Sequence, residues 1–504
     1  MIIIHQVLQI HPTDNVSVAL APLATGEVIA VNGLSVTVLE EVPVGHKLAL
    51  RDIAAGDPVR KYGFTIGHAT RPIRRGEWVH SHNVATALHD KLEYRYEPSF
   101  HEPPVLTGQV PAFQGYRRGD GRVGIRNEIW IINTVGCINK QSERLAELAR
   151  QQYQPQIAAG RIDGVYAFSH PYGCSQLGED LHNTQKLLAG LVGHPNAGGV
   201  LVVGLGCENN QMADFQKILG PVDPNRVKFL VLQEVADELA VGLQLLGELI
   251  DFAGSFQPEP VPVSELTIGL KCGGSDGFSG ITANPLVGAA ADRLIAYGGT
   301  AILSEVPEMF GAETILMNRA KDQATFEKVV ALINDFKDYF IRNGQEVYEN
   351  PSPGNKDGGI TTLEDKSLGC TQKGGTSIVT DVLRYGERSR VKGLNLLEGP
   401  GNDIVSCTAL AAAGAQIILF TTGRGNPMGA IVPTIKVSTN GRLAQEKPHW
   451  IDFNAGKLLE GSTMEQLSGE FFQYLLAVAG KEQLTQNERN GYRDMAIFKS
   501  GVTL

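Results

Sequence analysis

The chain has 504 residues, a formal net charge of −10 and 42% hydrophobic residues. That length exceeds what one hydrophobic core usually supports, so two or three domains are expected. The acidic balance disfavours a general nucleic-acid binder or a membrane-surface protein, and an anionic ligand would need locally placed cations. No apolar run approaches the ~20 residues that span a bilayer, and residues 1–5 have no basic region of a signal peptide, so we expect a soluble cytoplasmic protein.

Residues 1–96 are predicted to form a small β-rich domain, because short alternating runs are separated by Gly, Pro and Asp at close intervals. Near its end, GEWVHSHNV places His80 and His82 on one face of an extended segment. Two imidazoles on one face can chelate a metal ion, whereas the alternative is a pair of surface or hydrogen-bonded histidines. The Pro-rich residues 97–114 are typical of a linker.

After residue 115 strands and helices alternate, which indicates mainly parallel sheets covered on both faces. A second linker-like stretch near residues 254–265 divides this region, so we predict two Rossmann-like α/β lobes, at 115–256 and 257–504. Strands are expected at 128–135, 165–169, 200–205, 227–232, 266–270, 300–305, 394–397 and 416–420. Helices are expected at 141–151, 184–191, 211–219, 235–252, 289–296 and 324–343.

The strongest local signal runs from Asp163 to Asn210, where two apolar runs flank a helical middle and each run ends in Gly-Cys. A strand, a crossover helix and a parallel strand bring both strand ends to one edge of a sheet, where open α/β sheets bind ligands. The alternative is that the glycines only make turns. Small or polar groups also follow other strand candidates, at residues 136–139, 271–276, 305–308, 399–403 and 422–425.

The stretch from Asn350 to Thr376 is too long and too rich in glycine for an ordinary connection. Because long ordered loops are usually lids or binding loops, we predict an active-site loop near residues 350–376.

The absence of several catalytic motifs limits the classes of reaction that the sequence suggests. No GxGxxG follows a strand, and the chain has no GxxxxGK[ST], no HExxH and no CxxC pair, which disfavours nucleotide-driven chemistry and the familiar zinc sites. Strand ends rich in hydroxyls, amides and carboxylates suit a small, hydroxyl-rich anion. In such an anion, a base could remove the proton next to the carboxylate while an acid protonates a departing hydroxyl. A divalent metal that binds the carboxylate would stabilise the negative charge that develops.

Long strings of the sequence resemble the altronate/galactarate dehydratase family over nearly the whole length: FSHPYGCSQLGED, KCGGSDGFSGITANP, SEVPEMFGAE and YENPSPGNKDGGITTLEDKSLGCTQK. The resemblance implies an N-terminal β-clip domain of the SAF type and a large α/β catalytic region. It implies a hydro-lyase that converts D-altronate to 2-dehydro-3-deoxy-D-gluconate in hexuronate breakdown, with galactarate or another sugar acid as the alternative substrate and Fe²⁺ or Mn²⁺ as the cofactor. A sugar-acid binding protein on the same scaffold is the alternative outside enzymes.

Candidate site residues come mostly from the strand ends. His170 follows a strand and can serve as a base near neutral pH, while Glu208 can act as an acid or a metal ligand unless it only caps a helix. Arg424, in a Gly-Arg-Gly loop, can bind a carboxylate through two hydrogen bonds, although an ordinary ion pair is the alternative. The predicted residues are His170, Glu208 and Asp276 for catalysis, His80, His82 and Glu208 for the metal, and Arg126, Asn127, Gln176, Asn209, Lys271, Ser275 and Arg424 for the substrate.

The cysteines suggest an iron-sulfur cluster as an alternative cofactor. Three thiolates and an open iron would make an iron-sulfur dehydratase, whereas the alternative is small residues in tight turns. The candidates are Cys137, Cys174, Cys207, Cys272 and Cys370. The expected partners are a small sugar acid and a second copy of the chain in a homodimer, with no nucleic acid and no membrane.

Overall fold

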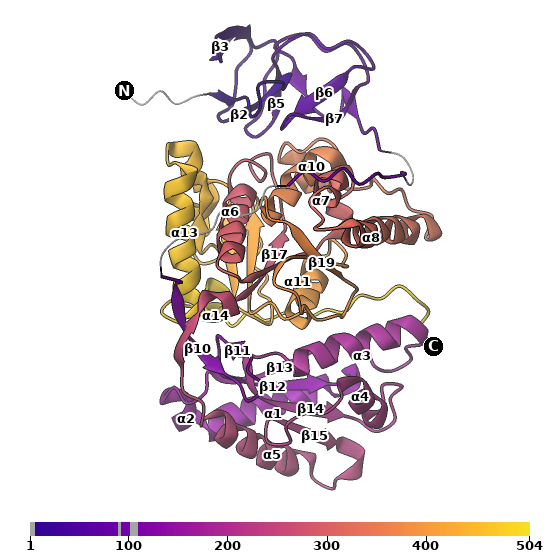
Figure 1. The fold of residues 1–504 in the computed structure, drawn as a ribbon, viewed down its shortest axis with the longest axis vertical. Coiled ribbons are helices and arrows are strands. Elements are labelled where there is room, and N and C mark those ends of the chain that lie inside the picture. The colour runs from indigo at the N-terminus through magenta and orange to yellow at the C-terminus, as the bar shows by residue number, and fades with distance from the viewer. Residues whose placement is uncertain (1–5, 89–91, 101–108) are drawn as a thin grey trace.

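A computed structural model describes residues 6–88, 92–100 and 109–504, so residues 1–5 and part of the predicted linker lie outside the described chain. The N-terminal β-rich region, the larger α/β lobe and the smaller α/β lobe follow one another along the long axis (Figure 1). This architecture confirms the predicted fold class. None of the helices in the described ranges combines the length and apolar character needed to cross a membrane.

The N-terminal domain is built from short antiparallel strands. One sheet contains β1 (Val7–Leu8), β2 (Val16–Ala19), β5 (Lys47–Ala49) and β8 (Trp78–Val79), a second contains β6 (Pro58–Lys61), β7 (Phe64–Ala69) and β9 (Val84–Ala85), and β3 (Val28–Val31) forms a hairpin with β4 (Leu34–Thr37). Val59 and Ile66 of this domain pack in one apolar cluster with Ala312 and Leu368 of the larger lobe. The core of the small domain is therefore continuous with the lobe below it.

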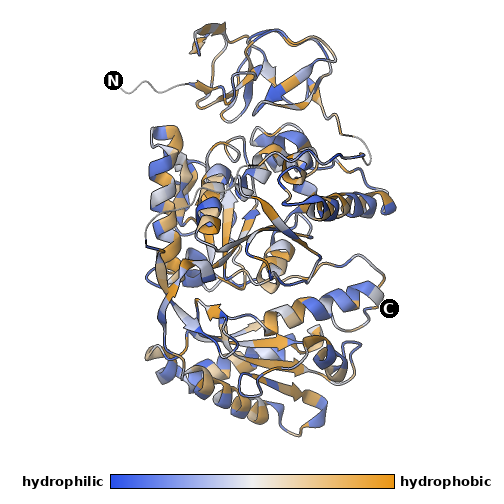
Figure 2. Ribbon diagram, viewed as in Figure 1, coloured by the Kyte–Doolittle hydropathy of each residue, from blue (hydrophilic) through white to orange (hydrophobic). Residues whose placement is uncertain are grey.

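The smaller lobe has a parallel four-stranded sheet in the order β13 (Gly164–Phe168), β12 (Glu128–Asn133), β14 (Ala197–Gly204) and β15 (Val227–Val231). Alternate residues of β12 face opposite sides, as a pleated strand requires. Ile129 and Ile131 pack with α1 (Asn139–Gln152) and α5 (Glu238–Ala253), while Trp130 and Ile132 pack with α3 (Gly178–Val192) and α4 (Met212–Leu219). Figure 2 shows these strands mostly in the colour of hydrophobic residues, as expected for a sheet covered on both faces.

The larger lobe has a parallel seven-stranded sheet around β17 (Thr267–Cys272). On one side lie β18 (Thr300–Leu303), β20 (Gly393–Leu397) and β19 (Val379–Leu383), and on the other lie β21 (Ile417–Thr422), β22 (Thr434–Ser438) and β23 (Phe453–Asn454). The strand order therefore changes direction between β17 and β21. Helices that cover the sheet include α6 (Ala283–Ala296), α8 (Gln323–Arg342), α11 (Asp403–Ala412) and α13 (Met464–Ala479).

The predicted loop near residues 350–376 is largely helical in the structure. It forms α9 (Pro353–Asp357), α10 (Leu363–Cys370) and a 3₁₀ turn at Thr371–Gly374. All of α10 is buried, and Thr362 caps it by accepting a hydrogen bond from the Asp365 amide. Glycines between the helices made the sequence resemble an open loop. The segment instead forms a packed layer between the N-terminal domain and the larger lobe (Figure 1).

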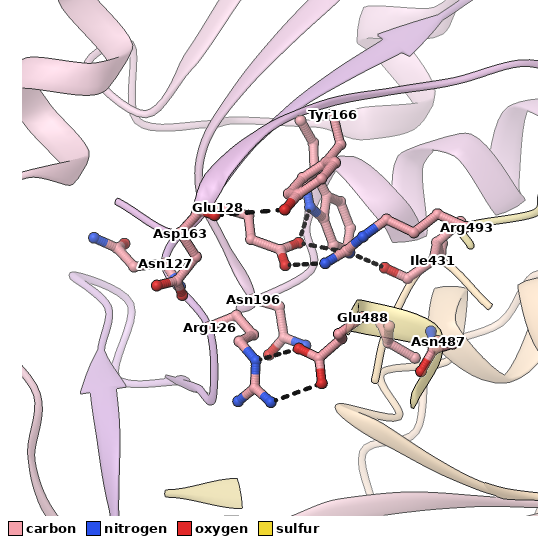
Figure 3. Close-up of polar contacts among 12 residues, drawn as sticks. Arg126, Asn127, Glu128, Asp163, Tyr166, Asn196, Ile431, Asn487, Glu488 and Arg493 are labelled. Atoms are coloured by element: carbon pink, nitrogen blue, oxygen red, sulfur yellow. Dashed lines mark hydrogen bonds and ion pairs between the residues drawn. The ribbon is translucent and has the colours of Figure 1, made fainter. Parts of the chain in front are cut away.

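The two lobes are joined by a strand pair and by buried ion pairs. β10 (Ala112–Arg117), which enters the smaller lobe, pairs with β16 (Glu259–Pro262), which leaves it through the stretch predicted as a linker. Figure 3 shows Arg126 bound to Glu488, with Nε 2.7 Å from Oε1, and Arg493 bound to Glu128, with Nη2 2.7 Å from Oε1.

These contacts correct two of the predicted substrate residues. Arg126 and Asn127 precede β12, at the opposite end of that strand from the polar turn that follows it. Both are buried, and the Asn127 side-chain amide donates to the carbonyls of Arg161 and Ala253. The Arg126 guanidinium therefore joins the two lobes, and the Asn127 side chain joins segments within the smaller lobe.

Replacing Glu488 with Gln should destabilise the junction between the lobes. Gln keeps the capping of α14 (Gln486–Asn490) but removes the charge that faces the buried Arg126 guanidinium. Because an unpaired buried charge is costly, the free energy of unfolding should fall by about 2–3 kcal/mol, measured by urea unfolding. Glu470→Gln, which loses only a half-exposed pair with Lys457, should leave the urea midpoint unchanged. An equal effect of the two substitutions would contradict the assignment.

Candidate active site

The carboxyl ends of the central strands of the larger lobe surround a cavity of about 590 Å³. This is the edge at which the strand order changes direction, where open α/β sheets bind ligands. The cavity is lined by side chains that follow four strands and by residues of the α9–α10 segment, among them Cys272, Ser275, Glu308, Asn355, Lys366, Asp403 and Arg424. A larger hollow of about 960 Å³ lies between the lobes, but its lining has no thiol.

Two thiols and a carboxylate, which are potential metal ligands, meet at the buried wall of this cavity. Cys272 Sγ and Cys370 Sγ lie 3.0 and 3.2 Å from Glu308 Oε2, and the two sulfurs are 3.4 Å apart. Among the described residues, only these three offer a set of His, Cys, Asp or Glu ligand atoms that all lie within 4.8 Å of one another. The group can therefore hold a metal ion.

Three buried lysines surround the group. Lys366 Nζ lies 2.9 Å from Glu308 Oε1, Lys373 Nζ donates to Cys272 Sγ at 2.8 Å, and Lys271 Nζ pairs with Asp403 Oδ1 at 2.9 Å. Burial alone would disfavour the Glu308 carboxylate, but the three ammonium groups hold its pKa well below the ordinary value. The pKa of Cys370 is raised well above its ordinary value by its hydrogen bond with Cys272 and by burial. The wall therefore combines buried ammonium groups with buried carboxylates.

Glu305 fixes the geometry of this wall. Its backbone adopts the left-handed conformation, with φ of 70°, which costs of order 1–3 kcal/mol in a residue other than glycine. In exchange, its carboxylate binds Lys271, Lys373 (3.0 Å) and the Cys272 amide (3.0 Å). Backbone strain of this kind is concentrated at functional sites.

The N-terminal domain supports the site through α10. Lys47 Nζ and Lys61 Nζ both bind Asp365, at 2.8 and 3.0 Å, and all three side chains are buried. Although burial opposes it, the two ammonium groups lower the pKa of Asp365 far below the ordinary value. The next residue, Lys366, points to the cavity and Glu308. Docking of the small domain and placement of Lys366 are therefore linked through one helix.

Four of the predicted residues lie at or next to this cavity. Ser275 and Arg424 line it, and Lys271 contacts its wall. Asp276 is half-buried beside it, where its carboxylate accepts hydrogen bonds from Thr439, Ser279 and Asn440, and desolvation raises its pKa. These contacts support a role for Asp276 in holding neighbouring loops in position rather than in contacting a ligand.

The predicted metal ligands His80 and His82 lie in a turn and have different surroundings. Strand β8 ends at Val79, and the chain then turns, with the Asn83 and Val84 amides both donating to the His80 carbonyl. His80 is buried, stacks on Trp78 and lies 3.3 Å from Thr361 Oγ1, whereas His82 is exposed. Burial and the nearby Lys47 lower the pKa of His80 to about 3. The extended segment that the prediction assumed is thus a turn in the structure.

The other predicted residues gather at a separate place, the carboxyl edge of the smaller lobe. His170 is buried with Nε2 2.9 Å from the Asn133 carbonyl. Glu208 accepts hydrogen bonds from Thr134 Oγ1 and the Leu205 and Gly206 amides. Gln176 and Asn209 belong to the same turns. The structure thus brings the two Gly-Cys strand ends together, as predicted, but in a different lobe from the cavity.

Sequence reasoning missed the residues that define the cavity wall. Glu305 and Glu308 were visible only as a polar strand end and Lys366 only as part of a supposed loop, while Cys272 and Cys370 were candidates only for an iron-sulfur cluster. Since Cys370 is far from Cys272 in the sequence, no spacing rule connects them. The available signal was the recurrence of thiols and carboxylates at strand ends.

Family models match all three parts of the chain. The altronate/galactarate dehydratase SAF domain matches residues 5–87, the D-galactarate dehydratase/altronate hydrolase second domain residues 115–254, and the D-galactarate/altronate dehydratase C-terminal domain residues 263–503. The chain belongs to the D-galactarate/altronate dehydratase family. The resemblance noted in the sequence is thereby confirmed.

Within the family, the chain is similar to altronate dehydratases. It is 54% identical over 499 residues to the altronate dehydratase of Escherichia coli (strain K12), covering 99% of this chain and 100% of the relative. It is 54% identical over 498 residues to that of Bacillus subtilis (strain 168), covering 99% of each. Identity to the galactarate dehydratase (L-threo-forming) of Escherichia coli (strain K12) is 32% over 516 residues, covering 97% of this chain and 96% of the relative.

Proposed function

We propose that this chain is an altronate dehydratase, a hydro-lyase that converts D-altronate to 2-dehydro-3-deoxy-D-gluconate and water. The 54% identity over the full length of two altronate dehydratases carries this proposal and favours altronate over galactarate, where identity is 32%. The cavity of about 590 Å³, whose lining includes Lys366 and Arg424, is consistent with a six-carbon sugar acid, since small-ligand pockets usually span about 300–1,000 Å³.

Cys272, Glu308 and Cys370 are the residues that would hold the divalent metal. Two thiols and one carboxylate fit Fe²⁺ better than Mn²⁺, because Mn²⁺ prefers oxygen ligands and thiolates are soft donors. Three protein ligands leave coordination positions for other oxygens. When bound, such an ion acts as a Lewis acid toward a carboxylate.

The residues that line the cavity supply binding and proton transfer. We assign Arg424 and Lys366 to the substrate carboxylate, because both are cations at the cavity wall. Asp403, at the start of α11 and held by Lys271 at 2.9 Å, is the proposed base that removes the proton from carbon 2. The same carboxyl group then returns a proton to the hydroxyl leaving carbon 3, so that water departs and the enol becomes the 2-keto acid.

The test is a keto-acid assay on the purified protein after incubation with Fe²⁺. Altronate should yield a 2-keto-3-deoxy acid at least tenfold faster than galactarate, a chelator should abolish the reaction, and added Fe²⁺ should restore it. Faster turnover of galactarate would reassign the substrate. No turnover of either acid with iron restored would leave the sugar-acid binding alternative, which binding without product would support.

Replacing Arg424 with Gln should weaken substrate binding. A charge-assisted hydrogen bond is worth about 1.5–3 kcal/mol, so KM for altronate should rise about ten- to hundredfold. The matched control is Arg442→Gln, because Arg442 is exposed and pairs only along its own helix with Glu446. Steady-state kinetics of the two variants measures the difference. An unchanged KM in Arg424→Gln would remove Arg424 from the substrate site.

A further inference from the structure

Three of the six cysteines are exposed, and all three occupy the same position in neighbouring turns of the smaller lobe. Cys137, Cys174 and Cys207 each follow a glycine after the carboxyl end of β12, β13 or β14. These strands are adjacent, in the order β13-β12-β14, so the three thiols lie at one edge of one sheet. The proposed altronate site lies in the other lobe and uses none of them.

Hydrogen bonds hold the three turns against one another. The Gly136 amide donates to the Tyr172 carbonyl at 2.8 Å, which joins the first turn to the second. The Asn210 amide donates to the Gly173 carbonyl at 3.0 Å, and the Ser175 amide donates to Asn209 Oδ1 at 2.7 Å, which joins the second to the third. The three turns that carry the thiols are therefore held in place relative to one another.

The backbone of these turns is costly to build. Gly173 and Gly206, directly before two of the cysteines, have φ of 99° and 126°, and a Cβ at Gly173 would lie 2.0 Å from the Thr134 carbonyl oxygen. Ser175, directly after Cys174, has φ of 57° although it is not a glycine. Strain of this kind persists where the surroundings impose it, and it is concentrated at ligand sites.

A buried, unpartnered donor lies in the same turn. Gln176 is 1% exposed, and its Oε1 accepts a hydrogen bond from the Gly173 amide at 3.0 Å. Its Nε2 is buried without a hydrogen-bond partner in the described structure. Because buried polar groups almost always have partners, this amide is suited to an acceptor supplied by a ligand.

The three thiols are not close enough together to share a single ion. A single tetrahedral ion with metal–sulfur bonds of about 2.3 Å holds its thiolates roughly 3.8 Å apart. Cys137, Cys174 and Cys207 are not all within 4.8 Å of one another, since among the described residues only the Cys272 group meets that limit. A four-iron, four-sulfide cluster binds each thiolate through a different iron and so accepts a wider triangle.

We propose that Cys137, Cys174 and Cys207 bind a [4Fe–4S] cluster at the carboxyl edge of the smaller lobe. Gln176 Nε2 is then a donor to one of its sulfurs. His170 in the same turns does not supply a fourth ligand, because Nε2 contacts the Asn133 carbonyl and Nδ1 accepts from the Tyr172 amide. One iron is left for a solvent or carboxylate oxygen. This assignment does not depend on the proposed substrate or on the metal at Cys272.

The test is anaerobic reconstitution of the full-length protein with ferrous iron, sulfide and a thiol reductant, followed by desalting. We expect close to four iron and four acid-labile sulfide per chain above the single ion of the other site, a brown chromophore, and an electron paramagnetic resonance signal after one-electron reduction. Cys137→Ser, Cys174→Ser and Cys207→Ser should each retain less than a tenth of the sulfide while unfolding at the wild-type temperature, because these side chains are exposed.

Two controls separate this result from the proposed function. Cys407→Ala, at a buried cysteine of α11, should keep the cluster, and Cys272→Ser should keep it while losing altronate dehydration. Less than one sulfide per chain in the wild type, or sulfide retained in all three serine variants, would overturn the proposal whatever the activity. Binding of one zinc or iron without sulfide would also overturn it.

Discussion

Replacing Glu308 with Gln is expected to lower kcat/KM for altronate by about a thousandfold or more. Gln keeps the shape of the side chain but removes the only carboxylate of the Cys272–Glu308–Cys370 group and leaves Lys366 without its ion-pair partner. A Lewis acid contributes several kcal/mol to the transition state, and each 1.36 kcal/mol is about tenfold in rate. Steady-state kinetics and iron content after desalting measure the effect.

Glu327→Gln is the matched control, because Glu327 is an exposed glutamate of α8 whose hydrogen bond is to Gln323 one turn away. It should leave both kcat/KM and iron content at the wild-type level. Iron content and kcat/KM unchanged in Glu308→Gln would show that the metal of this enzyme lies elsewhere. Loss of kcat/KM with iron retained would instead assign the effect to Lys366 and the cavity charge.

Replacing Asp365 with Asn is expected to lower the free energy of unfolding at pH 7 by about 3–5 kcal/mol, because it leaves two buried ammonium groups without a counter-charge. Burial already lowers the pKa of Lys47 to about 8, against the opposing attraction of Asp365. Urea unfolding monitored by circular dichroism measures the loss. Asp214→Asn, which removes an exposed pair with Lys217, should change stability by less than about 0.5 kcal/mol.

The pH dependence of this difference follows from the lowered pKa of Asp365. The carboxylate contributes its full stabilisation above the unfolded-state pKa of about 3.9, and it loses that contribution only as pH falls through the lower folded-state pKa. The gap between wild type and Asp365→Asn should therefore persist from pH 7 to about 4.5 and shrink below that, as the carboxylate of the wild type becomes protonated. A gap that closes between pH 7 and 5 would contradict the burial of this pair.

Much of the fold could be predicted from sequence because its strands are continuous apolar runs buried on both faces. The predicted ranges 128–135, 165–169, 200–205 and 227–232 overlap β12, β13, β14 and β15 closely. Strands β19 and β22 were missed, since Asp381 and Lys436 interrupt their apolar patterns. The local sequence pattern predicts a strand well where all of its residues are apolar and buried. It fails where polar side chains lie in the sheet.

The site was only partly predictable because its members meet through tertiary packing. Ser275 and Arg424 follow neighbouring strands of one sheet, which the rule for strand ends can anticipate. Cys370 contacts Cys272 because it lies at the end of α10, a helix in the stretch that was predicted to be a loop. The extended segment predicted at His80 is instead a turn, set by the hydrogen bond from the His80 amide to Asn83 Oδ1.

The contacts of helix α10 also indicate the role of the covalent link to the N-terminal domain. Asp365 holds that domain through Lys47 and Lys61, and Thr362 donates to the Ile66 carbonyl, so the contacts that seat the domain do not involve residues 97–114. The covalent link then contributes effective concentration, because it keeps the domain near its docking site. A chain cut within that stretch should remain active when concentrated and lose activity on dilution, as the small domain dissociates like any other bound subunit.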